Sequence, residues 1–125
     1  MTTEHEEKER KERFVNALTI CCEKLSELVK KYNDMIDTLE DTFRVIVEVD
    51  FALREAPGWV IDAKGHCLSF DFNTVQRELL TFITDHSQKL TNAIISLENI
   101  RAILVEIKNK CCAGLNEAKR RLEIT

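Results

Sequence analysis

Residues 14–41 read FVNALTICCEKLSELVKKYNDMIDTLED, and this stretch decides the fold. Alternate steps of four and three residues, continued to residue 53, pass twelve positions, of which only Thr42 is neither apolar nor cysteine. A seven-residue repeat of this length is typical of a helix whose apolar stripe packs against other helices. The twelve positions are Phe14, Leu18, Cys21, Leu25, Leu28, Tyr32, Met35, Leu39, Thr42, Ile46, Val49 and Leu53.

A further row of apolar residues widens this stripe. It repeats every seven residues and comprises Val15, Cys22, Val29, Ile36 and Phe43. A two-stranded coiled coil needs a narrower stripe, so the helix is expected to touch more than one neighbour, as in a helical bundle. The run from Phe43 to Val49 is rich in β-branched residues, but the unbroken repeat favours a helix over a strand.

Local signals place this first helix at about residues 4–55. Thr3 and Glu6 have the spacing of an N-terminal capping box, and Pro57-Gly58 ends the helix. Between them, residues 4–13 are nearly all charged. Acid-to-base pairs four residues apart predict a solvated extension of the helix, with a docking arm for a partner as the alternative. The pairs are Glu4–Lys8, Glu6–Arg10, Glu7–Lys11 and Glu9–Arg13.

The connection, residues 56–70, loses the repeat and holds Pro57, Gly58 and Gly65. It predicts a folded loop over the end of a bundle, with a short turn at residues 62–65. Its apolar residues are expected to be buried, and Trp59 is expected to be a core plug, with an anchor for a partner as the alternative. These residues are Trp59, Val60, Ile61, Leu68 and Phe70.

A second helix is predicted at about residues 71–123. Asp71 as the N-cap would let Phe70 pack onto Val75, and Asn73 with Gln76 is the alternative capping pair. The four-three repeat then returns, and basic residues 119–121 suit the helix C-terminus. The repeat positions are Leu79, Ile83, His86, Leu90, Ala93, Leu97, Ile100, Leu104, Ile107, Cys111, Gly114 and Ala118, flanked by Leu80, Phe82, Ile94, Ile95 and Ile103.

Two helices of matched length joined by one short connection predict an all-α chain: a single-domain antiparallel hairpin over residues 1–125. Two helices share only one seam, so their broad stripes require further helices. The hairpin is therefore expected to form a homodimer or to join a hetero-oligomer of helical subunits, as a bundle or coiled coil. The predicted interface residues are Val15, Leu18, Cys22, Leu25, Val29, Tyr32, Ile36, Leu39, Phe43, Trp59, His86, Leu90, Ile94, Leu97 and Leu104.

Composition narrows the class of partner. The formal net charge of −4 argues against nucleic acid as the main partner. No run is apolar and long enough to cross a membrane, and the charged N-terminus predicts no signal peptide. Together with five cysteines, four of them in adjacent pairs, this favours reduced thiols in a cytoplasmic or nuclear protein.

The cysteine pairs are interpreted as small core residues. A turn centred near residue 63 would place residue i opposite residue 127−i, so Cys22 would face residue 105, some distance from Cys111 and Cys112. Adjacent cysteines on a helix diverge, which makes a four-thiolate zinc site the less favoured alternative.

No catalytic constellation is evident, so no cofactor and no enzymatic activity are expected. His86 on an apolar stripe predicts a packed or interface histidine rather than a ligand. His66-Cys67 suggests a nucleophile only within a pocket that the sequence does not indicate. The predicted function is a structural or adaptor subunit of a multi-protein complex. The alternative is a bundle that holds a metal or small ligand through His86 and the cysteine pairs.

Overall fold

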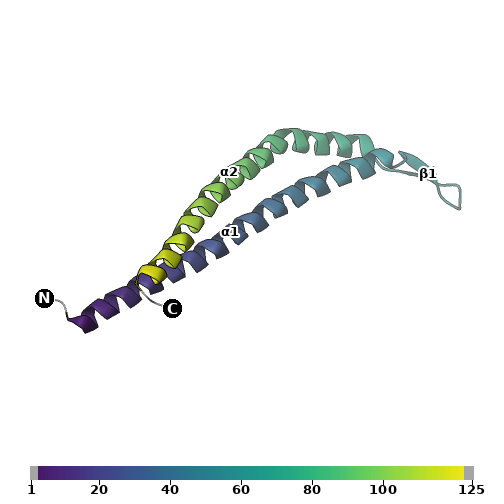
Figure 1. Cartoon of the computed structure of the whole chain (residues 1–125). Helices are drawn as coiled ribbons and strands as arrows, with labels where there is room; N and C mark the ends of the chain where they lie inside the picture. The colour runs from purple at the N-terminus through teal and green to yellow at the C-terminus, as the bar shows by residue number, and fades with distance from the viewer. Residues whose placement is uncertain (1–2, 123–125) are drawn as a thin grey trace. The chain divides into compact units, whose positions relative to one another are not determined.

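The computed structural model of the chain describes residues 3–122 and confirms an all-α helical hairpin (Figure 1). Helix α1 runs from Glu4 to Glu55 and helix α2 from Phe72 to Arg121, without interruption at Gly114. Two short strands lie between them, β1 (Trp59–Ile61) and β2 (Cys67–Ser69). The chain divides into two units, which we call the terminal unit (residues 3–35 and 97–122) and the turn unit (residues 36–96).

Side-chain caps fix both helix starts. The Glu6 amide donates to Thr3 Oγ1 at 3.2 Å, and the Thr3 amide donates to Glu6 Oε2 at 3.4 Å, which confirms the capping box. At α2, the Thr74 amide donates to Asp71 Oδ1 at 3.0 Å, so Asp71 is the N-cap. In the charged first turns, Arg13 pairs with Glu9 at 3.6 Å as predicted, whereas Arg10 pairs with Glu7 at 3.4 Å.

In the terminal unit, the helices close one seam of half-buried side chains. Val15 is 5% exposed and Leu115 8% exposed, while the neighbouring seam residues are partly covered. The sequence left two rows that could face α2 together with Leu18 and Leu25, one beginning at Phe14 and the other at Val15. The structure buries the row that begins at Val15. The seam comprises Val15, Leu18, Cys22, Leu25, Val29 and Tyr32 from α1, with Leu97, Arg101, Leu104, Lys108, Cys111, Leu115 and Ala118 from α2.

The register of this seam differs from the prediction by one full repeat. Cys22 is joined to Cys112, and Arg101 Nη1 donates to Asn33 Oδ1 at 3.0 Å, so residue i lies opposite residue 134−i. The predicted relation, 127−i, is wrong by seven residues. A shift of seven leaves the same rows facing each other, so the apolar repeat alone does not set the register.

In the turn unit, α1 keeps the same seam rows, from Ile36 (3% exposed) through partly covered Leu39 and Phe43. Helix α2 departs from the four-three repeat. Its partly covered positions Leu79, Ile83 and Ser87 are separated by two consecutive steps of four, and the step from Ser87 to Leu90 is three. Such an insertion locally changes which residues face the partner helix. Its covered positions before Leu97 are Leu79, Ile83, Ser87, Leu90 and Ile94.

The connection forms an antiparallel β-hairpin that the sequence did not predict. Val60 lies opposite Leu68, and the Asp62 amide donates to the His66 carbonyl at 2.9 Å. The predicted turn at residues 62–65 is confirmed: the Gly65 amide donates to the Asp62 carbonyl at 3.1 Å, and Gly65 has φ of 82°. A three-residue loop that ends in a left-handed glycine is a common hairpin connection.

Candidate protein interface

The positions of the terminal unit are easiest to describe by lettering each heptad from its buried seam. In α1, Val15 then stands at position a and Leu18 at position d; in α2, Arg101 stands at a and Leu104 at d. Positions g and e flank the seam, and c lies beside g on the outer surface. Because the helices run in opposite directions, the g positions of both helices lie along one side of the seam, and the e positions lie along the other.

Most of the large apolar side chains that remain exposed in the terminal unit, six of seven, lie on the g side. Among its described residues there are seven, with exposures of 38–58%: Phe14, Leu28 and Met35 at g of α1, Ile20 at f of α1, Ile100 and Ile107 at g of α2, and Ile103 at c of α2. None of the seven stands at b or e. We call the surface formed by Phe14, Leu28, Met35, Ile100, Ile103 and Ile107 the outer face.

On the opposite side of the seam, three consecutive e positions of α1 are polar, and their side chains are hydrogen-bonded within the unit. Thr19 Oγ1 donates to the Val15 carbonyl at 2.8 Å, and Ser26 Oγ donates to the Cys22 carbonyl at 2.9 Å. Asn33, the next e position, accepts the hydrogen bond from Arg101. The g side carries exposed apolar side chains, whereas the other side exposes no large apolar side chain at b or e, so the unit has one surface suited to a further helix.

The cysteine pairs meet at one level of the seam, and the structure corrects the expectation of reduced thiols. Cys22 and Cys112 form a disulfide with a Cα–Cα distance of 5.1 Å, whereas Cys21, Cys111 and Cys67 are free thiols. The Cys111 thiol is half-buried and donates to the Leu18 carbonyl at 3.8 Å. A sulfur in a disulfide is not a thiolate ligand, so this arrangement does not form the four-thiolate zinc site considered above.

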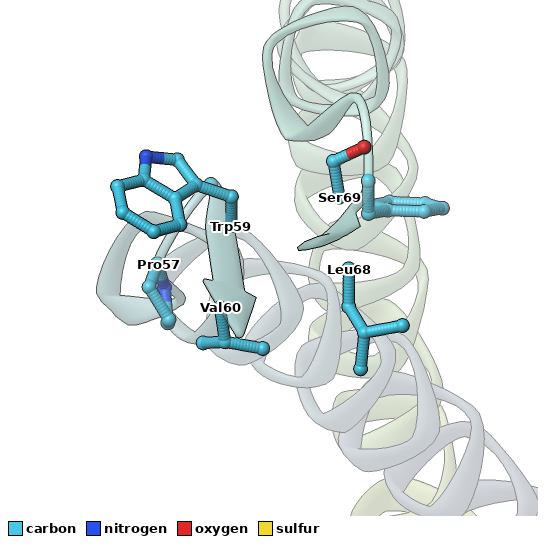
Figure 2. A pocket seen from close by; sticks show the side chains of 7 residues that line it. Pro57, Trp59, Val60, Leu68 and Ser69 are labelled. Carbon is cyan, nitrogen blue, oxygen red and sulfur yellow. The ribbon is translucent and has the colours of Figure 1, made fainter. Parts of the chain in front are cut away.

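The β-hairpin in the turn unit carries a second apolar surface. Trp59 is 63% exposed and Phe70 56% exposed, so the expectation of a buried core plug is wrong. The strands cover only each other, because a two-stranded sheet has no interior in which to bury a side chain. Beside them lies a shallow hollow of about 280 Å³ (Figure 2), lined by Pro57, Gly58, Trp59, Val60, Leu68, Ser69 and Phe70.

His86 lies outside the seam, contrary to its predicted position on the apolar stripe. Its ring is exposed and stacks on Phe82 with a centroid distance of 4.3 Å, and its Nδ1 lies 2.9 Å from the Phe82 carbonyl oxygen. The two consecutive steps of four in α2 place Ser87 inward instead. Within residues 3–122, no three His, Cys, Asp or Glu side chains are grouped so that they could hold a metal ion.

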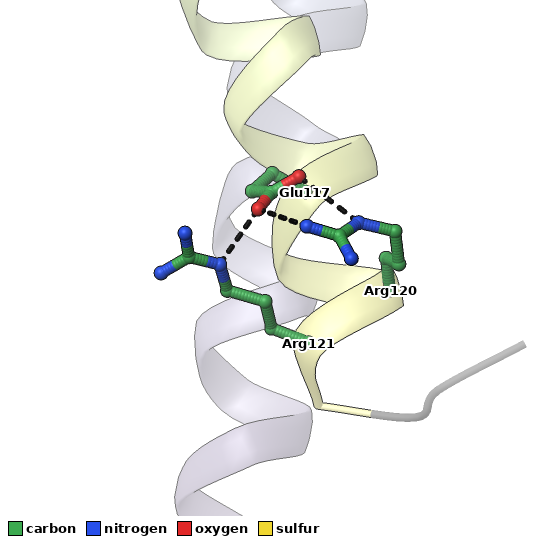
Figure 3. Close-up of polar contacts among 3 residues, drawn as sticks. All are labelled: Glu117, Arg120 and Arg121. Carbon is green, nitrogen blue, oxygen red and sulfur yellow. Dashed lines mark hydrogen bonds and ion pairs between the residues drawn. The ribbon is translucent and has the colours of Figure 1, made fainter.

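Among the described residues, the carboxyls of Asp62, Asp71 and Glu117 have a lowered pKa. Side-chain and backbone hydrogen bonds from Thr74 lower the pKa of Asp71, and backbone hydrogen bonds from His66 and Lys64 lower that of Asp62. The pKa of Glu117 is lowered by Arg120 and then by Arg121, whose Nε atoms lie 3.2 Å and 2.6 Å from its oxygens (Figure 3). These groups order a helix start, a turn and a helix end.

Most of the predicted interface residues lie between the chain's own helices. Trp59 and His86 are exposed; the others are buried or half-buried, namely Val15, Leu18, Cys22, Leu25, Val29, Tyr32, Ile36, Leu39, Phe43, Leu90, Ile94, Leu97 and Leu104. The residues of the outer face were absent from that prediction. Their sequence signal was the width of the apolar stripe, which exceeds what one seam covers.

Comparisons with known proteins give no relative: no family, no curated protein and no solved structure matches the chain. Neither helix, as far as residues 3–122 describe it, combines the length and apolar content that a membrane span requires.

Proposed function

We propose that this chain is a non-enzymatic assembly subunit that binds helices of partner proteins through the outer face of the terminal unit. One observation carries the proposal: six of the seven large exposed apolar side chains of this unit lie on the g side of a seam that is already closed, and none of the seven stands at b or e. Several half-exposed Leu, Ile, Met and Phe side chains leave on the order of 500 Å² of apolar surface, near the upper end for a monomer.

The matched length of the two helices supports a partner that lies along them. Phe14 and Met35 are 21 residues apart, so the α1 row of the outer face is about 31 Å long at 1.5 Å per residue. This length suits a helix of about three heptads. The contact would bury apolar rows at the centre and leave charged side chains at the rim, as protein interfaces do.

The experiment compares two double variants of the full chain. Leu28→Gln with Ile107→Gln removes the centre of the outer face, and Ser26→Gln with Asn109→Gln is the matched control on the opposite side. Light scattering of the full chain mixed with a synthetic amphipathic peptide of three heptads, over a dilution series, reads out assembly with a partner helix. We expect the outer-face variant to remain helical and to lose assembly, while the control retains it. Equal assembly by both variants would refute the proposal.

The proposal includes a cytoplasmic or nuclear location, and this location bears on whether the Cys22–Cys112 disulfide is oxidised or reduced. Cytoplasm and nucleus keep such bonds reduced, whereas oxidising compartments close them. The structure closes the Cys22–Cys112 bond, so the cytoplasmic or nuclear location that we propose requires that the cell keep this bond reduced and that the seam alone hold the terminal unit. Mass spectrometry of alkylated protein from its native cells decides this, because a closed Cys22–Cys112 bond there would contradict the proposed location.

A further inference from the structure

The charged residues at position c beside the outer face are mostly basic. Position c is the row nearest to the g positions, and the charged residues that it carries beside the apolar side chains are Arg10, Lys24 and Lys31 on α1 and Lys110 on α2. Each lies three or four residues from an apolar residue of the face. The acidic exception at c is Glu117, whose carboxylate is already engaged by Arg120 and Arg121 (Figure 3).

A shallow hollow of about 310 Å³ lies within this row and is lined by Lys24, Glu27, Leu28 and Lys31. An apolar side chain placed over Leu28 would bring its neighbours along a helix within reach of the two lysines. The present partner of Lys24 is Glu27, 3.3 Å away, and the two side chains are 73% and 53% exposed. An exposed pair of this kind is weak, so the lysine is free to exchange partners.

From these observations, and resting on the function proposed above, we propose that the outer face takes one amphipathic helix of a partner protein whose apolar stripe is flanked by acidic residues. The apolar rows would supply most of the affinity. Arg10, Lys24, Lys31 and Lys110 would select the partner and set its position, because complementary rim charges act mainly on specificity and association rate.

A second copy of the chain fits this surface less well. The opposite side of the terminal unit offers no large exposed apolar side chain at b or e, so a copy would have to present its own outer face. That contact sets the same basic rows against each other, and like charges across an interface are unfavourable. Acidic residues also lie on this side: Glu7 at position g pairs with Arg10, and Glu6, Glu27, Asp34 and Glu106 stand one row further out, at position f.

The test uses two synthetic three-heptad peptides with the same leucine stripe, one flanked by glutamate and the other by lysine, each fluorescently labelled and titrated with the full chain. Anisotropy should show the glutamate peptide binding at least about tenfold more tightly, with a preference that shrinks in high salt. Lys31→Glu should weaken that peptide by about three- to fivefold. Lys30→Glu is the matched control, because Lys30 is next to Lys31 in the sequence but stands at b on the opposite side. The affinity of this variant for the glutamate peptide should not change.

The outcomes separate this inference from the proposed function. If both peptides bind equally and Leu28→Gln with Ile107→Gln abolishes both, the helix-binding function stands and the acidic preference is wrong. If neither peptide binds and the chain alone forms a dimer that the same double variant dissociates, the occupant is a second copy and the inference fails. If neither peptide binds and the double variant changes nothing, the proposed function fails as well.

Discussion

The terminal unit and the turn unit distribute their exposed apolar side chains differently. In the terminal unit six of the seven lie on one side of the seam, and Ile20 lies on the back of α1. In the turn unit, α1 exposes Val45, Val47, Val49 and Phe51 by 45–65%, and residues two apart on a helix point in nearly opposite directions. The first unit can be completed by one helix laid along it, whereas the second presents apolar surface in several directions.

This difference shows how a helical surface can be interpreted. A free stripe beside a closed seam marks a defined site for a partner. A helix that is apolar around its circumference indicates burial by several neighbours, and the exposed β-hairpin of the turn unit adds to that requirement. The terminal unit also has two links between its helices, the Cys22–Cys112 disulfide and the Asn33–Arg101 hydrogen bond. Its internal packing should therefore be the more specific of the two.

The largest expected effect comes from the disulfide. The bond closes a loop with a sequence separation of 90, and Cys22→Ser with Cys112→Ser should lower the free energy of unfolding by about 4.6 kcal/mol in the chain-entropy description. Urea unfolding measures the total change in the free energy of unfolding. Hydrogen exchange should show the loss of protection in residues 3–35 and 97–122. Cys21→Ser, at an exposed thiol, is the control. Equal unfolding midpoints for the oxidised and reduced chain would contradict the prediction.

A charge in the seam should have the next largest effect. Leu25→Asp places a carboxylate between the helices and removes apolar contacts, which should cost about 3 kcal/mol and disrupt assembly. Ser26→Asp tests the same charge one residue away, on the polar side, and should change stability little. The helical circular dichroism signal followed during thermal unfolding compares the two. A folded Leu25→Asp chain with an unchanged melting temperature would show that the seam is misplaced.

A smaller effect is expected at the start of α2. Asp71→Ala removes the N-cap and should lower the melting temperature less than Leu25→Asp does. The pKa of Asp71 is lowered from 3.8, so its contribution is fully present above about pH 4 and is lost as pH falls through the folded-state value. The difference between wild type and variant should therefore shrink in acid. A constant difference from pH 7 to pH 2 would mean that the carboxylate does not act as the cap.

The smallest effect on stability is expected at Trp59. Trp59→Ser removes a side chain that is 63% exposed, so unfolding of the isolated chain should change by less than about 0.5 kcal/mol. Its indole fluorescence should already be red-shifted in the folded protein. A large loss of stability would show that the turn unit buries Trp59 in solution, and would narrow the contrast between the two units.

Signals contained within a few residues were readable from the sequence. Thr3 with Glu6, Asp71, Gly65 and Pro57 each act on their own neighbours, so the helix ends and the turn followed from them. Pairing across the hairpin was not readable. The repeat looks the same after a shift of seven residues, so nothing in it marked Cys112 rather than residue 105 as the partner of Cys22.

The candidate site was only half predictable. The excess width of the stripe indicated that a partner is required, but the pattern treated the rows beginning at Phe14 and at Val15 alike. Which row faces inward depends on the path of α2, where Ser87 rather than His86 takes the inward position. The short strands were missed because Trp59–Ile61 and Cys67–Ser69 are too brief for an alternating pattern to stand out.

The disulfide has a mechanical consequence. It joins residue 22 to residue 112, so in the oxidised chain tension applied at the two ends passes directly through the sulfur–sulfur bond. The seam between these residues, the β-hairpin and most of both helices then lie outside the load path. In the reduced chain the same tension pulls the helices apart from their open ends. The redox state of Cys22 and Cys112 would thus decide whether tension at the two ends stretches the disulfide or separates the two helices.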